Sequence, residues 1–384
     1  MMMSKLPAFL QEAHDHASKY YDKNHIQFLN HRWQNFVNRA CKEIPKLSYD
    51  ESTELLSLGR ISPGCELCRS GQWDCFFVTP KCNLNCEFCL SQRDLLEDFQ
   101  GSNWGNDLQE NINYYQAYDI QGISFSGGEP LLKQKDLINW VELGHKDPHI
   151  THIWLYTNGL LLNQEVLETL VQSGLHEIRV NAAATGYQHP HVMEMLHLAS
   201  KYFNWVTVEI PLIPDQSSQL LRAIPLWVDS GVQILNIHEL LFEPGSNAEK
   251  LTGERIEIYL PDGHHTAISP ESDTIALKVF SEITRNHLPI SVNYCSTVGK
   301  WRQLTARREV FLSEVKEPYE TYLGYGVLES FFIIEKDQAE PISSQLVEDI
   351  QKTRNDQPIY HLQRMVPLSL KAEQSNWILF EALS

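Results

Sequence analysis

Short apolar runs alternate with longer amphipathic stretches through the middle of the chain. Six runs have the length and composition of buried strands, namely residues 75–79, 122–126, 152–157, 177–182, 206–212 and 234–240. The stretches between them, such as 137–144 and 164–174, are long enough for helices. Strands that alternate with helices form parallel sheets with right-handed crossovers. The pattern therefore predicts an α/β fold. Six units are too few for a closed eight-stranded barrel, so we expect a partial (β/α)6 TIM-like barrel. An open doubly wound sheet is the alternative.

The pattern changes on either side of this region. Residues 1–60 place apolar side chains at helical spacing and predict an N-terminal helical segment. Residues 311–384 contain strand-like runs and one helical stretch near 343–351, which is typical of a small α+β module. We therefore expect these two parts to flank a partial barrel over 61–310 that begins with a Cys-rich loop.

The charge and composition of the chain exclude some classes of binding partner. The chain has 31 basic and 49 acidic residues, a net charge of −18, which repels nucleic acid backbones and anionic membranes. Residues 1–21 lack the apolar core of a signal peptide, and no uncharged apolar run is long enough to span a membrane. We therefore expect a cytoplasmic protein that binds neither nucleic acid nor membranes. Eight cysteines in such a protein favour metal binding or catalysis over disulfides.

Three cysteines directly follow the first predicted strand. Cys82, Cys86 and Cys89 have the spacing Cys-x3-Cys-x2-Cys. Thiolates are the preferred ligands of iron–sulfur clusters, and most simple clusters use four of them. A compact loop that supplies only three leaves one iron open for another ligand. A zinc site would normally require a fourth Cys or His nearby.

With these cysteines and two further elements, the sequence resembles the radical S-adenosylmethionine (SAM) superfamily over about residues 75–240. In that family an aromatic residue in the position of Phe88 lies next to the adenine of SAM. The element Ser126, Gly127, Gly128, Glu129 and Pro130 ends the second predicted strand and resembles the GGEP element that holds the SAM amino group. The third element, Tyr156, Thr157, Asn158 and Gly159, ends the next strand.

The resemblance implies a 4Fe-4S cluster whose open iron chelates SAM. Electron transfer from the reduced cluster would then cleave SAM to methionine and a 5′-deoxyadenosyl radical, which abstracts hydrogen from an unidentified substrate, such as a peptide or protein. An electron donor such as ferredoxin or flavodoxin would be needed. The family also places polar contacts to SAM on its later strands, where this chain has Arg179, Asn181, Glu209, Asn236 and His238. Each of these could equally be a satisfied polar residue inside a small barrel.

A second group of cysteines lies upstream. Cys65, Cys68 and Cys75 lie immediately upstream of the cysteine motif, and Cys295 ends a further predicted strand over 290–295. Three local thiols and one distant thiol make a closed tetrahedral set for mononuclear zinc or iron, and a second 4Fe-4S cluster is also chemically feasible. The alternative is that these cysteines are reduced and bind no metal.

A narrower resemblance concerns the runs 64–89, 208–215, 234–242 and 293–308. They are similar to an archaeal-type group of radical SAM proteins named loosely after the pyruvate formate-lyase activating enzyme. The methyl-coenzyme M reductase arginine methyltransferase of methanogens is a relative, and it also uses cobalamin. The sequence has no clear cobalamin-binding signature, so cobalamin-dependent C-methylation is the alternative function. A rival outside catalysis is a zinc-stabilised binding protein.

Overall fold

The computed structural model describes most of the chain, in two compact units. The larger unit consists of His31–Glu257 and Thr266–Gln303, and the smaller unit contains the described parts of Met1–Asn30, Ile258–His265 and Leu304–Ser384. The structure describes residues 23–91, 108, 112, 115–259, 265–324, 326–335, 338–342, 359–366 and 377–383. The boundaries expected at residues 60 and 310 stay predictions.

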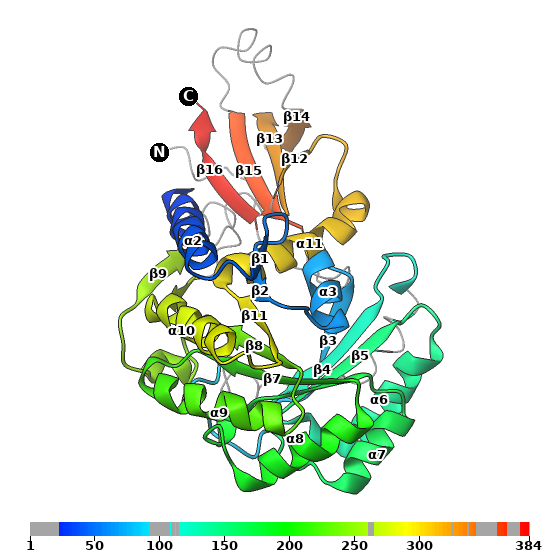
Figure 1. Ribbon diagram of the computed structural model, residues 1–384. Helices are drawn as coiled ribbons and strands as arrows, with labels where there is room; N and C mark the ends of the chain where they lie inside the picture. Colours follow the sequence, from blue (N-terminus) through cyan, green and yellow to red (C-terminus); the bar gives the residue numbers. More distant parts are fainter. Residues whose placement is uncertain are drawn as a thin grey trace. The chain divides into compact units, whose positions relative to one another are not determined.

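A mostly parallel sheet forms the centre of the larger unit (Figure 1). All six predicted strands are present, and each pairs in parallel with the next one along the chain. They are β3 (Trp73–Thr79), β4 (Gly122–Gly127), β5 (His152–Thr157), β6 (Glu177–Val180), β7 (Trp205–Pro211) and β8 (Ile234–His238). Strand β11 (Ser291–Cys295) adds a seventh parallel strand beside β8. The sheet has separate edges at β1 and β3 among the described strands, so it is the partial, open form of an α/β barrel.

The N-terminal helical prediction is correct only in part. Helix α2 spans Lys23–Glu43, but β1 (Leu47–Asp50) and β2 (Leu55–Leu58) form an antiparallel hairpin that pairs with β11. All four residues of β2 are buried, and a uniformly buried run this short has no periodicity that separates strand from helix. The turn between β1 and β2 ends at Glu54, whose carboxylate accepts a 2.8 Å hydrogen bond from Trp33 Nε1 in α2.

Helices cover one face of the sheet in the order of the strands (Figure 1). Side chains alternate between the two faces of a strand, and Ile123 and Ile153 point to the helical side, where they approach Gly144 of α6. The helices that follow the parallel strands are α6 (Gln134–Lys146), α7 (Gln164–Gln172), α8 (Pro190–Tyr202) and α9 (Ser217–Asp229), and α10 (Glu271–Arg285) precedes β11.

The other face of the sheet is polar and carries a short helix, α3 (Pro63–Ser70). Ser62 caps its N-terminus, Pro63 occupies its first position, and Gly71 ends it in the left-handed conformation with φ 76°. Within α3, Gly64 approaches Trp154 of β5, where a Cβ would lie 3.2 Å from the indole ring. The Cys-rich loop predicted from the sequence is therefore a capped helix packed on the inner face of the sheet.

Several short elements connect these parts. They are the 3-10 helices η3 (Pro130–Lys133), η4 (Ala182–Thr185), η5 (Pro214–Gln216) and η6 (Ala248–Lys250), and the paired strands β9 (Ile256–Tyr259) and β10 (His265–Ile268). Helix α11 spans Thr297–Val315.

The smaller unit contains an antiparallel sheet in the order β12-β13-β15-β16, with β14 also pairing with β13. Its strands are β12 (Thr321–Gly324), β13 (Val327–Glu335), β14 (Gln338–Ile342), β15 (Ile359–Met365) and β16 (Trp377–Leu383). The helical stretch expected near 343–351 lies outside the described residues. Across the described part of the chain, no helix is both long enough and apolar enough to cross a membrane.

Candidate active site

A cavity of about 380 Å³ opens at the carboxyl ends of the parallel strands. Its lining combines the cysteines after β3 with residues at the ends of β4 to β8 and with Lys300 of α11. Ligands of open α/β sheets bind at this end of the strands, where loops from several strands converge. The predicted site residues that line the cavity are Cys82, Cys86, Phe88, Cys89, Ser126, Gly127, Gly128, Asn158, Asn181, Glu209 and His238.

The cysteine loop is held from two sides. At one end, Asn158 Nδ2, just beyond β5, donates a 2.7 Å hydrogen bond to Asn83 Oδ1. At the other end, Asn247 Nδ2, in the loop after β8, donates to the carbonyl of Cys86 at 2.9 Å. The backbone N–H of Ala248 donates to the carbonyl of Cys89 at 3.3 Å. Two loops that are distant in sequence thus position the three thiols.

Gly128 lets the glycine pair approach the start of the cysteine loop. A Cβ on Gly128 would lie 2.1 Å from the carbonyl oxygen of Lys81, so any side chain would force the backbone apart. The backbone N–H of Gly128 donates to Thr79 at 2.7 Å, and that of Glu129 donates to Lys81 at 2.8 Å. Gly128 therefore allows close backbone packing at the start of the cysteine loop, and the contact of this element with SAM stays a prediction.

Glu129 is fully buried and does not line the cavity. Its carboxylate accepts hydrogen bonds from the N–H of Leu131 at 3.1 Å, the hydroxyl of Thr157 at 2.8 Å and the N–H of Asn158 at 2.8 Å. Burial raises the pKa of Glu129, and the bonds from Asn158, Thr157 and Leu131 oppose that rise. Glu129 thus ties the end of β4 to the end of β5, and its contact with SAM stays a prediction.

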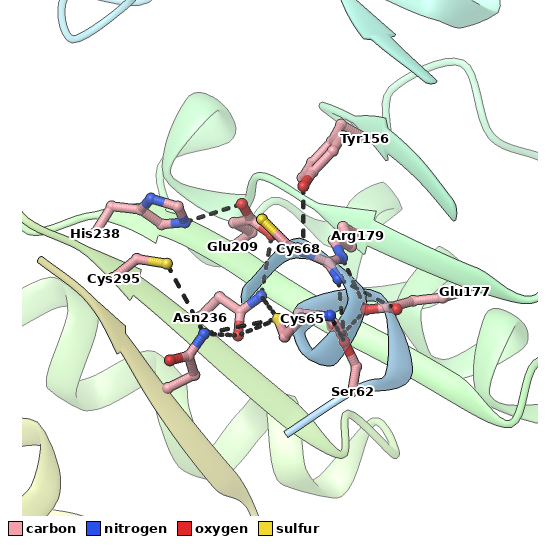
Figure 2. Close-up of polar contacts among 12 residues, drawn as sticks. Ser62, Cys65, Cys68, Tyr156, Glu177, Arg179, Glu209, Asn236, His238 and Cys295 are labelled. Carbon is pink, nitrogen blue, oxygen red and sulfur yellow. Dashed lines mark hydrogen bonds and ion pairs between the residues drawn. The ribbon is translucent and has the colours of Figure 1, made fainter. Parts of the chain in front are cut away.

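A polar network centred on the buried Arg179 extends from the cavity lining across the inner face of the sheet (Figure 2). Its guanidinium donates to Glu177 Oε1 at 2.8 Å, to Glu209 Oε2 at 3.2 Å and to the hydroxyl of Tyr156 at 3.2 Å. It also donates to Ser62, the N-cap of α3, at 3.1 Å. Five donors in a planar fork allow one side chain to join β5, β6, β7 and α3.

Glu209 is the acceptor at the mouth of this network. Besides the bond from Arg179, its carboxylate lies 2.9 Å from His238 Nε2 and accepts a 3.1 Å hydrogen bond from Asn236 Nδ2. Burial raises the pKa of Glu209, but Arg179 and His238 outweigh it and hold this pKa at about 2. Burial lowers the pKa of His238, which Lys300 lowers further and Glu209 opposes. The mouth of the network therefore carries a permanent carboxylate charge.

The structure brings together only part of the second set of cysteines, Cys65, Cys68, Cys75 and Cys295. Asn293 Nδ2 lies 3.6 Å from Cys65 Sγ and 3.9 Å from Cys295 Sγ, so one amide contacts both thiols. Gln303 similarly contacts Cys68 at 3.4 Å and Cys295 at 3.9 Å. Cys75 lies on β3, at the sheet edge away from β11.

Burial favours the protonated form of three of these thiols. It raises the pKa of Cys75 to about 12 and that of Cys295 to about 11, and it raises the pKa of Cys68 strongly. Since a bound metal requires thiolates, a metal would have to overcome this cost of deprotonation.

The arrangement of possible ligands bears differently on the predicted 4Fe-4S cluster and on the predicted single metal ion. Nowhere in the described ranges are three or more His, Cys, Asp or Glu side chains placed to hold one metal ion. The thiolates of a 4Fe-4S cluster bind different irons, so they surround a cluster rather than meet at one ion. Cys82, Cys86 and Cys89 line one cavity, and their binding of a cluster stays a prediction. A single tetrahedral ion does need convergence, and the site on Cys65, Cys68, Cys75 and Cys295 stays a prediction.

Lys300 and Asn247 are among the residues of this site that sequence reasoning missed. Lys300 follows the end of β11 and belongs to the cavity lining, and Asn247 holds the cysteine loop. The strand over 290–295 was expected, so the position of Lys300 just beyond that strand was a weak indication of a site residue. Nothing in the sequence indicated Asn247, because the loop after β8 has no periodicity.

Comparison with known proteins agrees with this geometry. Residues 76–224 match the Radical SAM superfamily. A Methanocaldococcus jannaschii protein named as a glycyl-radical enzyme activating enzyme is 29% identical over 279 residues, which cover 70% of this chain and 72% of that protein. A GTP 3′,8-cyclase of Clostridium perfringens is 30% identical over 107 residues, 27% of this chain and 32% of the cyclase.

Among solved structures, Streptococcus suis SuiB bound to precursor peptide SuiA aligns with a TM-score of 0.45 and 12% identity, over 66% of this chain and 55% of SuiB. The family match covers the strands and loops that build most of the cavity, and radical SAM proteins use a 4Fe-4S cluster and SAM. Residues 76–224 thus match the model of the radical SAM superfamily, and the chain as a whole is similar to a protein named as a glycyl-radical enzyme activating enzyme.

Proposed function

We propose that Cys82, Cys86 and Cys89 hold a 4Fe-4S cluster and that the cavity binds SAM for hydrogen abstraction from a substrate. The observation that carries this proposal is the shared cavity, which brings the three thiols together with the glycine pair and the polar ends of β5 to β8. When bound, the reduced cluster and SAM supply a 5′-deoxyadenosyl radical.

The residues around the thiols have distinct roles in this proposal. Gly127 and Gly128 expose backbone to the cavity, where the amino group of SAM can approach closely. Asn181 caps η4 by accepting from the N–H of Ala184 at 3.2 Å, which fixes its side chain at the cavity wall for a polar contact with SAM. Glu209 offers a carboxylate that stays charged at neutral pH.

An apolar cluster beside the cysteine loop limits access of water. Ile213, Leu240, Phe242 and Ala267 form a buried cluster, and Phe88 packs against it. Leu240 and Phe88 also line the cavity. A dry wall next to the thiols protects a reactive radical from side reactions with solvent.

The substrate we propose is a protein or peptide. The M. jannaschii relative is named for activating a glycyl-radical enzyme, which is a protein, and it matches this chain over most of both lengths. The reaction also needs a one-electron donor, for which we propose a ferredoxin or flavodoxin in the cytoplasm. The acidic charge of the chain, −18 overall, fits neither nucleic acid nor an anionic membrane as substrate.

The test is reductive cleavage of SAM by anaerobically reconstituted protein. With dithionite, the wild-type protein is expected to release 5′-deoxyadenosine and to contain about four irons from the cluster. Cys82→Ala, Cys86→Ala and Cys89→Ala together should remove those irons and the cleavage, while Cys41→Ala should retain both. Unchanged iron content in the triple variant would contradict the assignment.

The products separate hydrogen abstraction from cobalamin-dependent methylation. We expect 5′-deoxyadenosine without S-adenosylhomocysteine, whether or not cobalamin is added. Formation of methylcobalamin and S-adenosylhomocysteine would show methyl transfer instead. Mass-shifted products in a cell extract incubated with reduced enzyme and SAM would then identify the substrate.

A further inference from the structure

Lys300 places a cation at the cavity wall from outside the matched radical SAM domain. It lies in the first turn of α11, immediately beyond β11, whereas the family match ends at residue 224. Its backbone N–H donates to Ser296 at 2.9 Å, and the N–H of Thr297 donates to Glu239 Oε2 at 2.7 Å. The start of the helix is therefore fixed, and the side chain of Lys300 lines the same cavity as the three cysteines.

The other charged side chains of the cavity are already paired. Arg179 bonds Glu209 at 3.2 Å, and Glu239 forms an ion pair with Arg32 at 2.7 Å. Within the part of the chain that the structure describes, the ammonium of Lys300 forms no hydrogen bond or ion pair. An ammonium carries three donors, and a half-buried ammonium without a protein partner favours an anionic or polar ligand. Lys300 is thus a cation available to a ligand.

Its place in the sheet separates Lys300 from the glycine pair. In strand order, β11 lies five positions from β4, with β8, β7, β6 and β5 between them. The cavity bridges this span, because it is lined both by Gly128 at the end of β4 and by Lys300 after β11. A ligand anchored at Gly128 therefore leaves the Lys300 side of the cavity for a second molecule.

We propose that Lys300 anchors a subsite for a carboxylate of the substrate, opposite the glycine pair. This rests on the proposed function, and it assigns the substrate class as a carboxylate-bearing molecule, such as a peptide segment with an acidic side chain or a free carboxyl end. A single lysine next to Glu209 and Glu239 favours a monoanion, since a phosphate dianion would be repelled by both carboxylates. The backbone N–H of Thr297 at the start of α11 is already bonded to Glu239, so it is not free for phosphate.

The test uses ¹³C-acetate as the probe on oxidised, SAM-loaded holoenzyme. Binding broadens the acetate NMR line in proportion to the bound fraction. We expect Lys300→Met to reduce the broadening at least fivefold and Lys300→Arg to keep it within twofold. Lys278→Met, at an exposed position on α10, is the matched control and should behave as the wild type. Neutral acetamide, which has nearly the same shape, should not be broadened.

Three outcomes would overturn the subsite. Equal broadening of acetate in Lys300→Met, or equal broadening of acetamide, would show that Lys300 binds no carboxylate. Inorganic phosphate that displaces acetate at lower concentration than unlabelled acetate does would assign a different anion class. A tenfold loss of SAM affinity in Lys300→Met, with acetate broadening unchanged, would assign Lys300 to SAM.

The proposed function is measured separately. Release of 5′-deoxyadenosine from SAM is measured on the wild-type protein without substrate, and Lys278→Met, at the exposed position on α10, is expected to stay within twofold of that rate. If acetate fails to bind while the wild type still cleaves SAM, only the subsite is refuted. If the wild type does not cleave SAM, the proposed function fails, whatever acetate does.

Discussion

The side-chain amide of Asn247 donates a 2.9 Å hydrogen bond to the backbone carbonyl of Cys86, across 161 positions of sequence. The same amide donates to Asn85 Oδ1 at 2.7 Å. The loop that carries Asn247 is itself braced by Arg255, which donates to the carbonyls of Glu249 and Leu251. A braced loop after the last strand of the predicted barrel therefore holds the middle of the cysteine loop.

We expect Asn247→Ala to loosen the cysteine loop. The substitution removes two hydrogen bonds, each of which stabilises the loop by about 1 kcal/mol. A total loss of about 1–2 kcal/mol raises the population of the open loop by about five- to thirtyfold. Alkylation of Cys86 and Cys89 in the cluster-free protein, mapped by mass spectrometry, should accelerate accordingly. Asn286→Ala is the control, because that amide bonds Glu282 within α10, far from the cysteine loop in sequence. Equal alkylation rates in both variants would contradict the role of Asn247.

We expect Arg179→Met to destabilise the larger unit strongly. The substitution leaves Glu177, which is fully buried, without its cation, and breaking a buried pair in this way costs about 3–5 kcal/mol. Chemical denaturation should show the lower free energy of unfolding. Arg222→Met, at an exposed site on α9, should change it by less than about 0.5 kcal/mol. A small effect at Arg179 would mean that water replaces the guanidinium.

Stability should fall in mild acid because of His176. Burial, with His152 and His145 nearby, lowers its pKa to about 4, and its Nδ1 accepts a 3.1 Å hydrogen bond from the N–H of Ile153. The unfolded chain takes up this proton near pH 6.5 and the folded chain only near pH 4, so this contribution is present above pH 6.5 and is lost as pH falls toward 4.

The measurement is the free energy of unfolding between pH 7 and pH 4. His176→Gln should flatten its decline over that range, whereas His197→Gln, at an exposed position on α8, should leave the wild-type slope. If the slope is the same in both variants, other groups cause the acid sensitivity.

Metal analysis tests the four-cysteine site. The sequence predicts one further metal ion per chain that persists when Cys82, Cys86 and Cys89 are all replaced by alanine. Adding Cys295→Ser to that protein should remove this ion, and adding Cys41→Ser should not. If the triple variant contains no metal at all, the four cysteines are metal-free thiols, and Cys65, Cys68 and Cys295 are joined through the amides of Asn293 and Gln303.

The central strands and the chemistry at their ends could be predicted from the sequence. Buried parallel strands are continuous apolar runs, and β3 to β8 were found within a few residues of their ends. The residues of the cysteine motif and of the glycine pair lie together in short segments, so their spacing was visible without a structure.

Only the tertiary structure decided which distant residues complete the site. Whether β2 was strand or helix depended on its pairing with β11, more than 230 residues later. The structure placed Arg179 and Lys300 on the cavity wall and Asn247 against the cysteine loop, and it buried Glu129. Contacts of this kind arise when the sheet curves and its loops converge, and a local pattern of apolar and polar residues does not encode them.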